Sequence, residues 1–200
     1  MKEASIAIVY ASRFGHTKMQ AEAIARGASA NSAVTVKLYT AGEAIERIDE
    51  LDHFDAIIFG SATYMGNMAS EMKSFIEHAA GKWLNRSWKN KIAGGFTSSS
   101  NFSGDKFNTL MGLFIQAMQQ GMIWVGVDLL PACNVPDSEK TVEGPGAEAL
   151  NRVSSSIGPM AAVFRVKIPE APSSGDIATA EEYGQRIAEI TLTFRHGTEK

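Results

Sequence analysis

Short apolar runs alternate with amphipathic segments along the first two thirds of this chain. Five runs rich in β-branched and aromatic residues predict strands, at 6–10, 33–39, 55–60, 91–97 and 122–127. The first and third of them lack polar alternation, which is typical of parallel strands buried on both faces. Apolar residues at helical spacing predict helices between them, at 17–30, 41–50, 70–80 and 105–120. Strands that alternate with helices in this way predict a doubly wound α/β sheet with helices on both faces.

The strand–helix alternation breaks at 128–176, a segment rich in proline, glycine and serine. We expect one helix there, at about 147–155, within an otherwise irregular connection. A connection of this length inside a compact domain is usually functional or an oligomer contact. An amphipathic helix is predicted again at 177–194, where it returns to the sheet. We therefore predict that residues 1–200 form a single domain, with a long irregular insertion at about 128–176 before the C-terminal helix.

Composition removes several classes of partner. Of the 200 residues, 19 are Lys or Arg and 22 are Asp or Glu, giving a net charge of −3 without a basic run, so we expect no nucleic-acid partner. Cys133 is the single cysteine, which excludes a disulfide within the chain and favours a cytoplasmic location. The first apolar run is too short for a signal sequence or a membrane span, and no membrane span is predicted elsewhere. Four scattered histidines predict no metal site.

Candidate chemistry gathers in the loops that follow three of the predicted strands, because ligands of open α/β sheets bind at the carboxyl ends of strands. The first loop, 12–17, joins a strand to a helix start and contains two hydroxyls and Gly15. Unpaired amides at a helix start predict a phosphate site. An alternative interpretation is that Ser12 and Thr17 only cap the helix. The loop lacks the Gly-Lys-Ser/Thr of a nucleotide-hydrolysing P-loop.

The other two loops offer different side chains. The second, 62–67, combines the aromatic Tyr64 and the thioether Met65 with the amide Asn67, a mixture that suits the faces and edge of a planar heteroaromatic ring. The third, 97–104, offers hydroxyls and backbone amides, although it can also be interpreted as an ordinary polar turn. Together the loops predict a site for a ligand with both a phosphate and a flat ring.

Several motifs in order carry a resemblance to a known family. They are Ser12-x-x-Gly15-His16-Thr17, Gly60-Ser61-Ala62-Thr63-Tyr64-Met65-Gly66-Asn67, Ala93-Gly94-Gly95-Phe96-Thr97-Ser98-Ser99 and Gly121-Met122. The sequence resembles the flavodoxin-like FMN proteins of the WrbA type, a family that contains NAD(P)H:quinone oxidoreductases. The resemblance implies a five-stranded parallel sheet of order 2-1-3-4-5, and it implies an assembly, a homodimer or homotetramer, that completes the site.

The resemblance also implies a non-covalent FMN and assigns residues to it. The phosphate would lie on the first loop, and the ring would lie between the second and third loops. The full set implied for the cofactor is Ser12, Arg13, Phe14, Gly15, His16, Thr17, Ala62, Thr63, Tyr64, Met65, Gly66, Asn67, Thr97, Ser98, Ser99, Ser100, Asn101, Gly104 and Gln120. Phe14 is implied to meet the nicotinamide nucleotide, and Trp83 to line the substrate cavity. The alternative for Trp83 is a core or interface tryptophan.

Two departures from the family pattern affect this hypothesis. Ser100, Phe102 and Ser103 stand where the family has glycines, so the third loop has a less permissive backbone. Gln119-Gln120 stands where the family has a pair of histidines, and glutamine cannot become cationic. Both departures fall at positions that the resemblance places around the ring.

The function implied by the resemblance is an FMN-dependent oxidoreductase. NAD(P)H would pass hydride to the flavin, and a quinone-like acceptor would then take two electrons in the same cavity. The side chains would position the reactants, and none would act as a catalytic nucleophile. The alternatives are a flavodoxin-type electron carrier and a non-enzymatic binding protein that has lost efficient quinone turnover.

Overall fold

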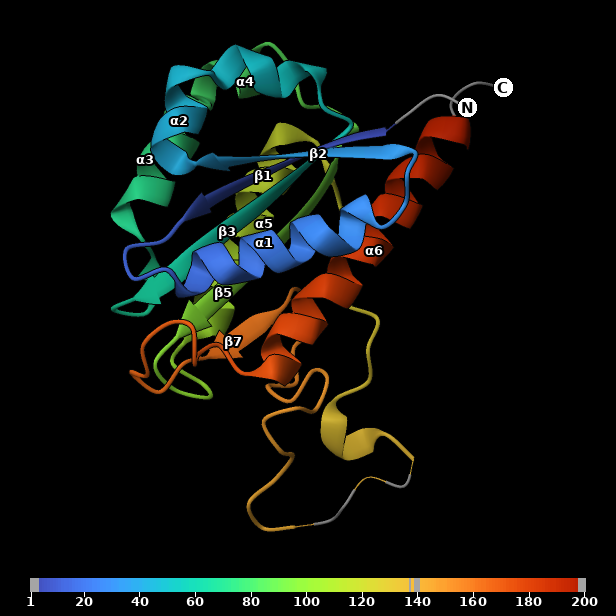
Figure 1. The fold of residues 1–200 in the computed structure, drawn as a ribbon. Coiled ribbons are helices and arrows are strands. Elements are labelled where there is room, and N and C mark those ends of the chain that lie inside the picture. The colour runs from blue at the N-terminus through green and yellow to red at the C-terminus, as the bar shows by residue number, and fades with distance from the viewer. Residues whose placement is uncertain (1–3, 137, 139–140, 198–200) are drawn as a thin grey trace.

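The computed structural model describes residues 4–136, 138 and 141–197. Its centre is a parallel sheet in which five strands follow the order β2-β1-β3-β5-β6 (Figure 1). These strands are β1 (Ala4–Ala11), β2 (Val34–Thr40), β3 (Ala56–Tyr64), β5 (Ile92–Ser99) and β6 (Ile123–Trp124). The order in space is the one that the resemblance implies, so the predicted doubly wound sheet is confirmed.

Two short strands extend this sheet. β4 (Asn67–Met68) folds back antiparallel on β3 as a small hairpin. β7 (Met160–Ala162) lies parallel to the last residues of β5, along the edge whose first part is occupied by β6. The sheet edge near the carboxyl ends is therefore completed by a strand from the region predicted to be irregular.

Helices cover both faces of the sheet, as predicted. On one face lie α1 (His16–Ser29) and α6 (Ser174–Gly197), which cross in close contact (Figure 1). On the other lie α2 (Ala41–Glu46), α3 (Ser70–His78), α4 (Ala80–Leu84) and α5 (Lys106–Gln120). Alternate residues of β3 enter two separate cores: Ile57 packs with α3 and α5, and Ile58 packs with α1 and α6.

Two predicted helices are shorter than their apolar pattern indicates. The helix expected at 41–50 ends at Glu46 and is followed by the 3-10 helix η1 (Ile48–His53). The helix expected at 70–80 ends at His78, where the chain turns into α4. Both breaks leave the order of elements unchanged.

The prediction of a helix at 147–155 is wrong, since these residues form turns. Asn151 and Ser154 adopt left-handed backbone angles, with φ of 47° and 61°. The side chain of Asn151 donates to the Leu129 carbonyl and accepts from the Ser155 amide. Such local side-chain bonds compete with a helical hydrogen-bond ladder. The described part of the segment also contains the 3-10 helix η2 (Ala132–Asn134), and the C-terminal helix begins at Ser174, three residues earlier than predicted.

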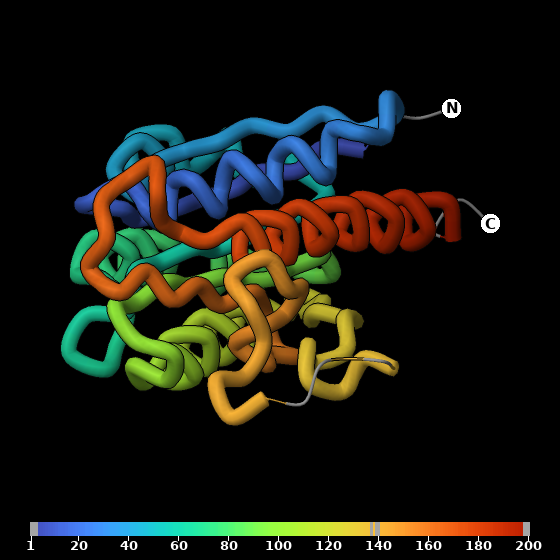
Figure 2. The backbone as a smooth tube through the Cα atoms, turned by 60° about the horizontal axis from the view of Figure 1, so that its bottom comes forward, coloured from blue at the N-terminus to red at the C-terminus, as the bar shows by residue number. Residues whose placement is uncertain are grey.

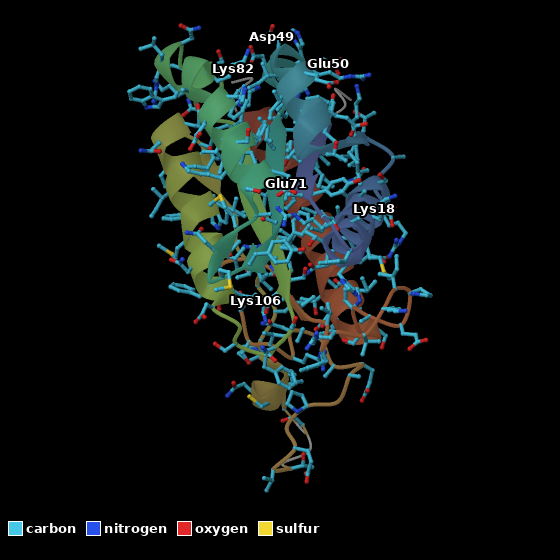
Figure 3. The ribbon with its side chains drawn as sticks, turned by 90° about the vertical axis from the view of Figure 1, so that its left-hand side faces the viewer. Lys18, Asp49, Glu50, Glu71, Lys82 and Lys106 are labelled. Atoms are coloured by element: carbon cyan, nitrogen blue, oxygen red, sulfur yellow. The ribbon has the colours of Figure 1, made fainter. Side chains whose placement is uncertain are left out.

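The two ends of the sheet are built differently. At the amino ends, the Lys82 ammonium on α4 lies 2.5 Å from Asp49 and 2.7 Å from Asp52, which joins α4 to η1. Figure 3 shows Lys82 and Asp49 at this end and Lys106 toward the opposite end. The predicted loops lie at the carboxyl ends, where the chain that precedes α6 passes beside the start of α1 (Figure 2). The architecture therefore brings four segments together at one end.

Candidate functional site

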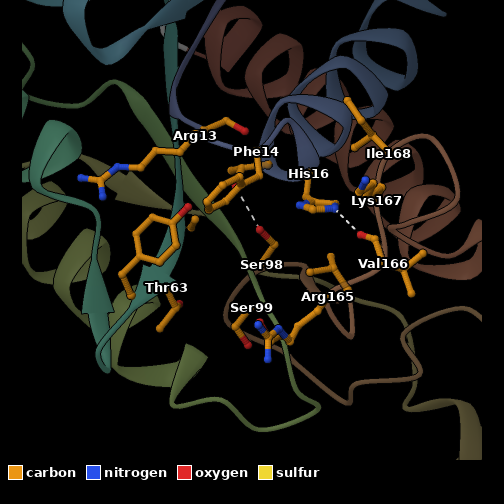
Figure 4. A pocket seen from close by; sticks show the side chains of 16 residues that line it. Arg13, Phe14, His16, Thr63, Ser98, Ser99, Arg165, Val166, Lys167 and Ile168 are labelled. Atoms are coloured by element: carbon orange, nitrogen blue, oxygen red, sulfur yellow. Dashed lines mark hydrogen bonds between the residues drawn. The ribbon is translucent and has the colours of Figure 1, made fainter.

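A cavity of about 630 Å³ opens at the carboxyl ends of β1, β3 and β5 (Figure 4). Its volume falls in the range of about 300–1,000 Å³ that small-molecule sites occupy. We distinguish the loop wall, formed by residues 12–17, 62–64 and 98–100, from the insertion wall, formed by residues 163–168. The lining residues are Ser12, Arg13, Phe14, His16, Thr17, Ala62, Thr63, Tyr64, Ser98, Ser99, Ser100, Val163, Arg165, Val166, Lys167 and Ile168.

The first loop leaves the start of α1 open to a ligand. Gly15 is the N-cap residue of the helix, with φ of 90°, and as a glycine it has no side chain to bond the first amides. Ser12 accepts a hydrogen bond from the Lys18 amide at 3.2 Å, whereas the Thr17 hydroxyl instead shares a 2.9 Å hydrogen bond with Ser98. Capping alone therefore does not account for both hydroxyls. The remaining amides and the positive end of the helix dipole lie at this end of the cavity. An anion is therefore best stabilised there.

Arg13 is held between Tyr64 of the loop wall and Glu71 of α3. Its guanidinium binds Glu71 through two hydrogen bonds of 2.8 and 3.0 Å and lies 5.2 Å from the centre of the Tyr64 ring. The hydrogen bonds from Arg13 lower the pKa of Glu71 to about 2. Burial raises the pKa of the Tyr64 phenol. Tyr64 therefore presents a neutral aromatic ring to the cavity at physiological pH.

The third loop is held from behind by a buried lysine that the sequence analysis did not single out. The Lys106 ammonium donates to the Ser99 hydroxyl at 3.0 Å, to the Phe102 carbonyl at 2.8 Å and to the Asn101 carbonyl. Burial lowers the pKa of Lys106 to about 8, so the ammonium keeps its three donors at neutral pH. These bonds gather the loop carbonyls away from the cavity.

The predicted residues beyond these positions lie around the cavity without lining it. Met65 and Asn67 form the β3–β4 hairpin with Gly66, and the Met65 side chain is fully exposed. Thr97 is buried below the cavity and hydrogen-bonds Thr63 at 2.9 Å. Gly15, Asn101 and Gly104 likewise lie in the loops without being lining residues.

The insertion wall is the part of the site that sequence reasoning missed. Two of its amides continue the β7 pairing onto the third loop, from Val163 to the Ser99 carbonyl and from Phe164 to the Ser100 carbonyl, both at 3.0 Å. His16 Nε2 donates to the Val166 carbonyl at 2.8 Å, which fixes the wall to the start of α1. The available signal was the alternation of apolar and charged residues in Phe164-Arg165-Val166-Lys167-Ile168, which the sequence analysis left within the irregular insertion.

Comparison with known proteins agrees with this architecture. A flavodoxin domain model matches residues 7–99. Flavodoxin FldP of Pseudomonas aeruginosa is 35% identical over 92% of this chain and 94% of that protein. An NAD(P)H dehydrogenase (quinone) of Rhodopseudomonas palustris is 30% identical over 97% of this chain and 100% of that protein. The crystal structure of the flavodoxin, WrbA-like protein from Agrobacterium tumefaciens matches with a TM-score of 0.70 and 31% identity, covering 96% of this chain and 99% of that one. This chain belongs to the WrbA-type family of flavodoxin-like proteins.

Two residues that the WrbA-type resemblance assigns to the site lie elsewhere in this chain. Trp83 is half exposed on α4, at the amino ends of the strands, and is absent from the cavity lining. Gln120 is buried at the end of α5, where its Nε2 donates to the Ala79 carbonyl at 3.1 Å. Within a single chain neither side chain reaches the cavity. Their assigned roles therefore remain predictions that require a second copy of the chain.

The electrostatics of this WrbA-type cavity differ from those of the whole chain, whose net charge is −3. The lining includes Arg13, Arg165 and Lys167 and contains neither aspartate nor glutamate. A wider depression of about 880 Å³ on the other side of the third loop includes Asp105 and Glu143. Because carboxylates repel a phosphate, the first cavity is the better site for an anionic ligand.

No three His, Cys, Asp or Glu side chains in the ranges 4–136, 138 and 141–197 lie together as metal ligands would. Within the same ranges, no helix combines the length and the apolar composition needed to cross a membrane.

Proposed function

We propose that this chain is an FMN-dependent NAD(P)H:quinone oxidoreductase. The observation that carries the proposal is the cavity at the carboxyl ends of the strands, which combines a helix start preceded by Gly15, three cationic side chains and no lining carboxylate. This donor set fits FMN, whose phosphate needs amides, hydroxyls and positive charge and whose ring needs apolar faces. The names of the relatives from Rhodopseudomonas palustris and other bacteria support the same activity.

In this proposal, the phosphate binds at the first loop. Amides at the start of α1 and the Ser12 hydroxyl donate to it, while the bond between Thr17 and Ser98 fixes the loop against β5. The cavity is ready for the anion before binding, so little reorganisation is needed.

The aromatic residues of the loop wall orient the flat rings. Tyr64 is held by Arg13, and Phe14 is 70% exposed at the mouth of the cavity. A fixed ring on one side suits a resident cofactor, and an exposed ring at the mouth suits a reactant that enters and leaves. When bound, FMN supplies the redox chemistry by accepting two electrons from NAD(P)H and delivering them to a quinone.

A flavodoxin-type electron carrier is the second candidate function, and one observation favours it. The relative that is 35% identical over 92% of this chain is named Flavodoxin FldP. Such a carrier would bind FMN at the same loops and exchange electrons with a protein partner, without oxidising NAD(P)H.

Anaerobic stopped-flow mixing distinguishes the two candidates. The purified protein, loaded with FMN, is mixed with NADH and with NADPH while the flavin absorbance is followed. We expect rapid bleaching with one or both nucleotides and recovery of the colour when a soluble quinone is added. An absence of bleaching with both nucleotides would overturn the oxidoreductase proposal and favour the carrier.

Titration of the FMN-free protein tests where the cofactor binds. Thr17→Val keeps the side-chain shape and removes the hydroxyl that bonds Ser98 at 2.9 Å. We expect FMN affinity to fall about tenfold, because a buried partner loses its hydrogen bond. Thr17→Ser keeps the hydroxyl and serves as the matched control. Equal FMN affinity in the valine variant would show that the bond between Thr17 and Ser98 does not position this loop for the phosphate.

We also propose that the chain forms a homodimer or homotetramer. Trp83 and Leu84 expose large apolar side chains on α4, and Phe107 and Ile115 do so on α5. A second copy that covers these residues offers Trp83 a route to the cavity of its neighbour. Sedimentation equilibrium measures the assembly, and a monomer at micromolar concentration would contradict it.

A further inference from the structure

The cationic side chains near the cavity differ in whether a carboxylate or a loop carbonyl already binds them. Arg13 is paired with Glu71 at 2.8 Å, and Arg152 is paired with Asp176 at 2.9 Å. The Lys106 ammonium is occupied by the third loop. Arg165 and Lys167 form no ion pair within residues 4–136, 138 and 141–197. The insertion wall therefore brings two uncompensated positive charges to a cavity without carboxylates.

Arg165 stands on an unusually shaped turn. Phe164 and Arg165 both have left-handed backbone angles, with φ of 45° and 60°, which side-chain-bearing residues rarely adopt in succession. The turn is held by the bonds to the third loop, by a 2.8 Å hydrogen bond from the Val166 amide to the Val163 carbonyl, and by the Phe164 ring, which lies 4.9 Å from the ring of Phe102. Strain of this kind persists where the surrounding structure imposes it and is concentrated at functional sites.

The two cations lie at different ends of the cavity. Lys167 stands between Val166, which His16 binds, and Ile168, whose side chain packs on Gly15 of the first loop. Arg165 follows the residue that bonds the Ser100 carbonyl, and Figure 4 shows its guanidinium extending toward Ser99. Lys167 is thus placed at the phosphate end and Arg165 at the ring end.

We propose that Arg165 is the electrostatic partner of the reduced cofactor. This inference rests on the proposed function. In the reaction, NAD(P)H gives two electrons and one proton to the flavin ring and leaves as NAD(P)⁺, so the ring gains one negative charge while the phosphate charge stays constant. A guanidinium at the ring end then binds reduced FMN more tightly than oxidised FMN. A lysine at the phosphate end strengthens the binding of both redox states equally.

Because Arg165 lies at the ring end of the cavity and Lys167 at the phosphate end, variants of the two residues are compared. The FMN-loaded wild type and the variants Arg165→Gln, Arg165→Lys and Lys167→Gln are titrated potentiometrically, and oxidised FMN is titrated into each FMN-free protein by fluorescence quenching. For Arg165→Gln we expect reduced FMN to lose about tenfold in affinity relative to oxidised FMN, a fall of about 30 mV in the two-electron potential. Arg165→Lys keeps the charge and most of the potential. Lys167→Gln weakens FMN binding without changing the potential.

Glutamine and lysine at position 165 bear the same left-handed backbone requirement as arginine, so these variants are matched for strain. A wild-type potential in Arg165→Gln, with FMN bound, would overturn the inference and leave the proposed function standing. Equal falls in potential in Arg165→Gln and Lys167→Gln would also overturn it, because the charge would then act without regard to position. A wild-type protein that binds no FMN would overturn the proposed function and this inference together.

Discussion

The loop wall and the insertion wall face the same cavity but differ in burial, in backbone conformation and in charge. In the loop wall, Thr17 and Ser98 are buried and hydrogen-bonded to each other, and the backbone follows directly from regular strands and helices. In the insertion wall, residues 164–168 are exposed, two of them have left-handed angles, and the backbone hydrogen bonds that hold them join loop segments rather than strands or helices. The loop wall supplies fixed dipoles, whereas the insertion wall supplies net charge.

The third loop and the insertion wall also differ in where their backbone is strained. The third loop has Ser100, Phe102 and Ser103 where the family resemblance implies glycines, yet none of residues 100–103 has a positive φ. Left-handed angles lie instead at Gly104 and Asp105 and across the cavity at Phe164 and Arg165. In this chain, strained positions therefore stand both at the end of the third loop and in the insertion wall, and the insertion wall also carries Arg165 and Lys167.

Gly158→Ala tests whether the insertion wall depends on its contact with β5. A Cβ at residue 158 would lie 2.0 Å from the Gly95 carbonyl oxygen, and the backbone must move to relieve the clash. We expect the free energy of unfolding to fall by about 2–3 kcal/mol, together with weaker FMN binding. Urea denaturation and FMN titration measure the two effects. Gly42→Ala, where nothing lies within 4 Å of the added Cβ, is the matched control and should be near wild type.

Lys106→Met tests the support behind the loop wall. Methionine is of similar length but leaves the Asn101 and Phe102 carbonyls without their donor, so we expect a loss of about 2 kcal/mol of stability. The pKa of Lys106 is about 8 when folded and 10.5 ordinarily, so the unfolded chain holds the proton more tightly. Wild-type stability relative to the variant should therefore rise as pH increases from about 8 towards 10.5. Thermal unfolding across this range checks the sign, and a falling difference would contradict the assignment.

Arg165→Gly tests the strain in the insertion wall, and unlike the two variants above it is expected to stabilise the protein. Glycine adopts the 60° φ of this position without a steric penalty, so we expect the variant to be more stable by about 1 kcal/mol. The same change removes the guanidinium from the cavity. A gain in stability together with a loss of reduced-FMN affinity would show that strain is retained there for charge. Differential scanning calorimetry measures the stability, and a less stable variant would refute the strain argument.

Glu71→Gln has the smallest expected effect. The ion pair with Arg13 is about half exposed, so it contributes at most about 1 kcal/mol. The folded-state pKa of Glu71 is about 2 against an ordinary 4.5, so this stabilisation is fully present above pH 4.5 and is lost as pH falls towards 2. Wild type and variant should therefore converge in melting temperature over that interval. A constant difference down to pH 2 would exclude this pair as its source.

Much of the fold could be predicted because its signals are local and repeated. The β-branched runs at Ile6 and Ile57 identify buried strands. Phe75 and Leu110 each belong to a set of apolar residues at helical spacing, and both helices pack on the sheet. The loop wall followed from the same reasoning, since loops at the carboxyl ends of parallel strands meet in space. The prediction of a helix at 147–155 failed because the Asn151 side chain bonds the backbone of Leu129 and Ser155, which no periodicity reveals.

Hydrophobic periodicity and turn residues act within a few positions of one another, so the amino-acid sequence was enough to predict the strands and helices along the chain and the loops that begin the site. The order of the strands within the sheet was implied only by the family resemblance. Packing between distant segments established that residues 163–168 complete the cavity, that Lys106 supports the third loop, and that Trp83 lies at the end of the sheet opposite the cavity. The contacts of the insertion wall join residues about 60 to 150 positions apart, as between Val163 and Ser99 and between Val166 and His16. Such pairings are set by how whole elements pack, and no local pattern encodes them.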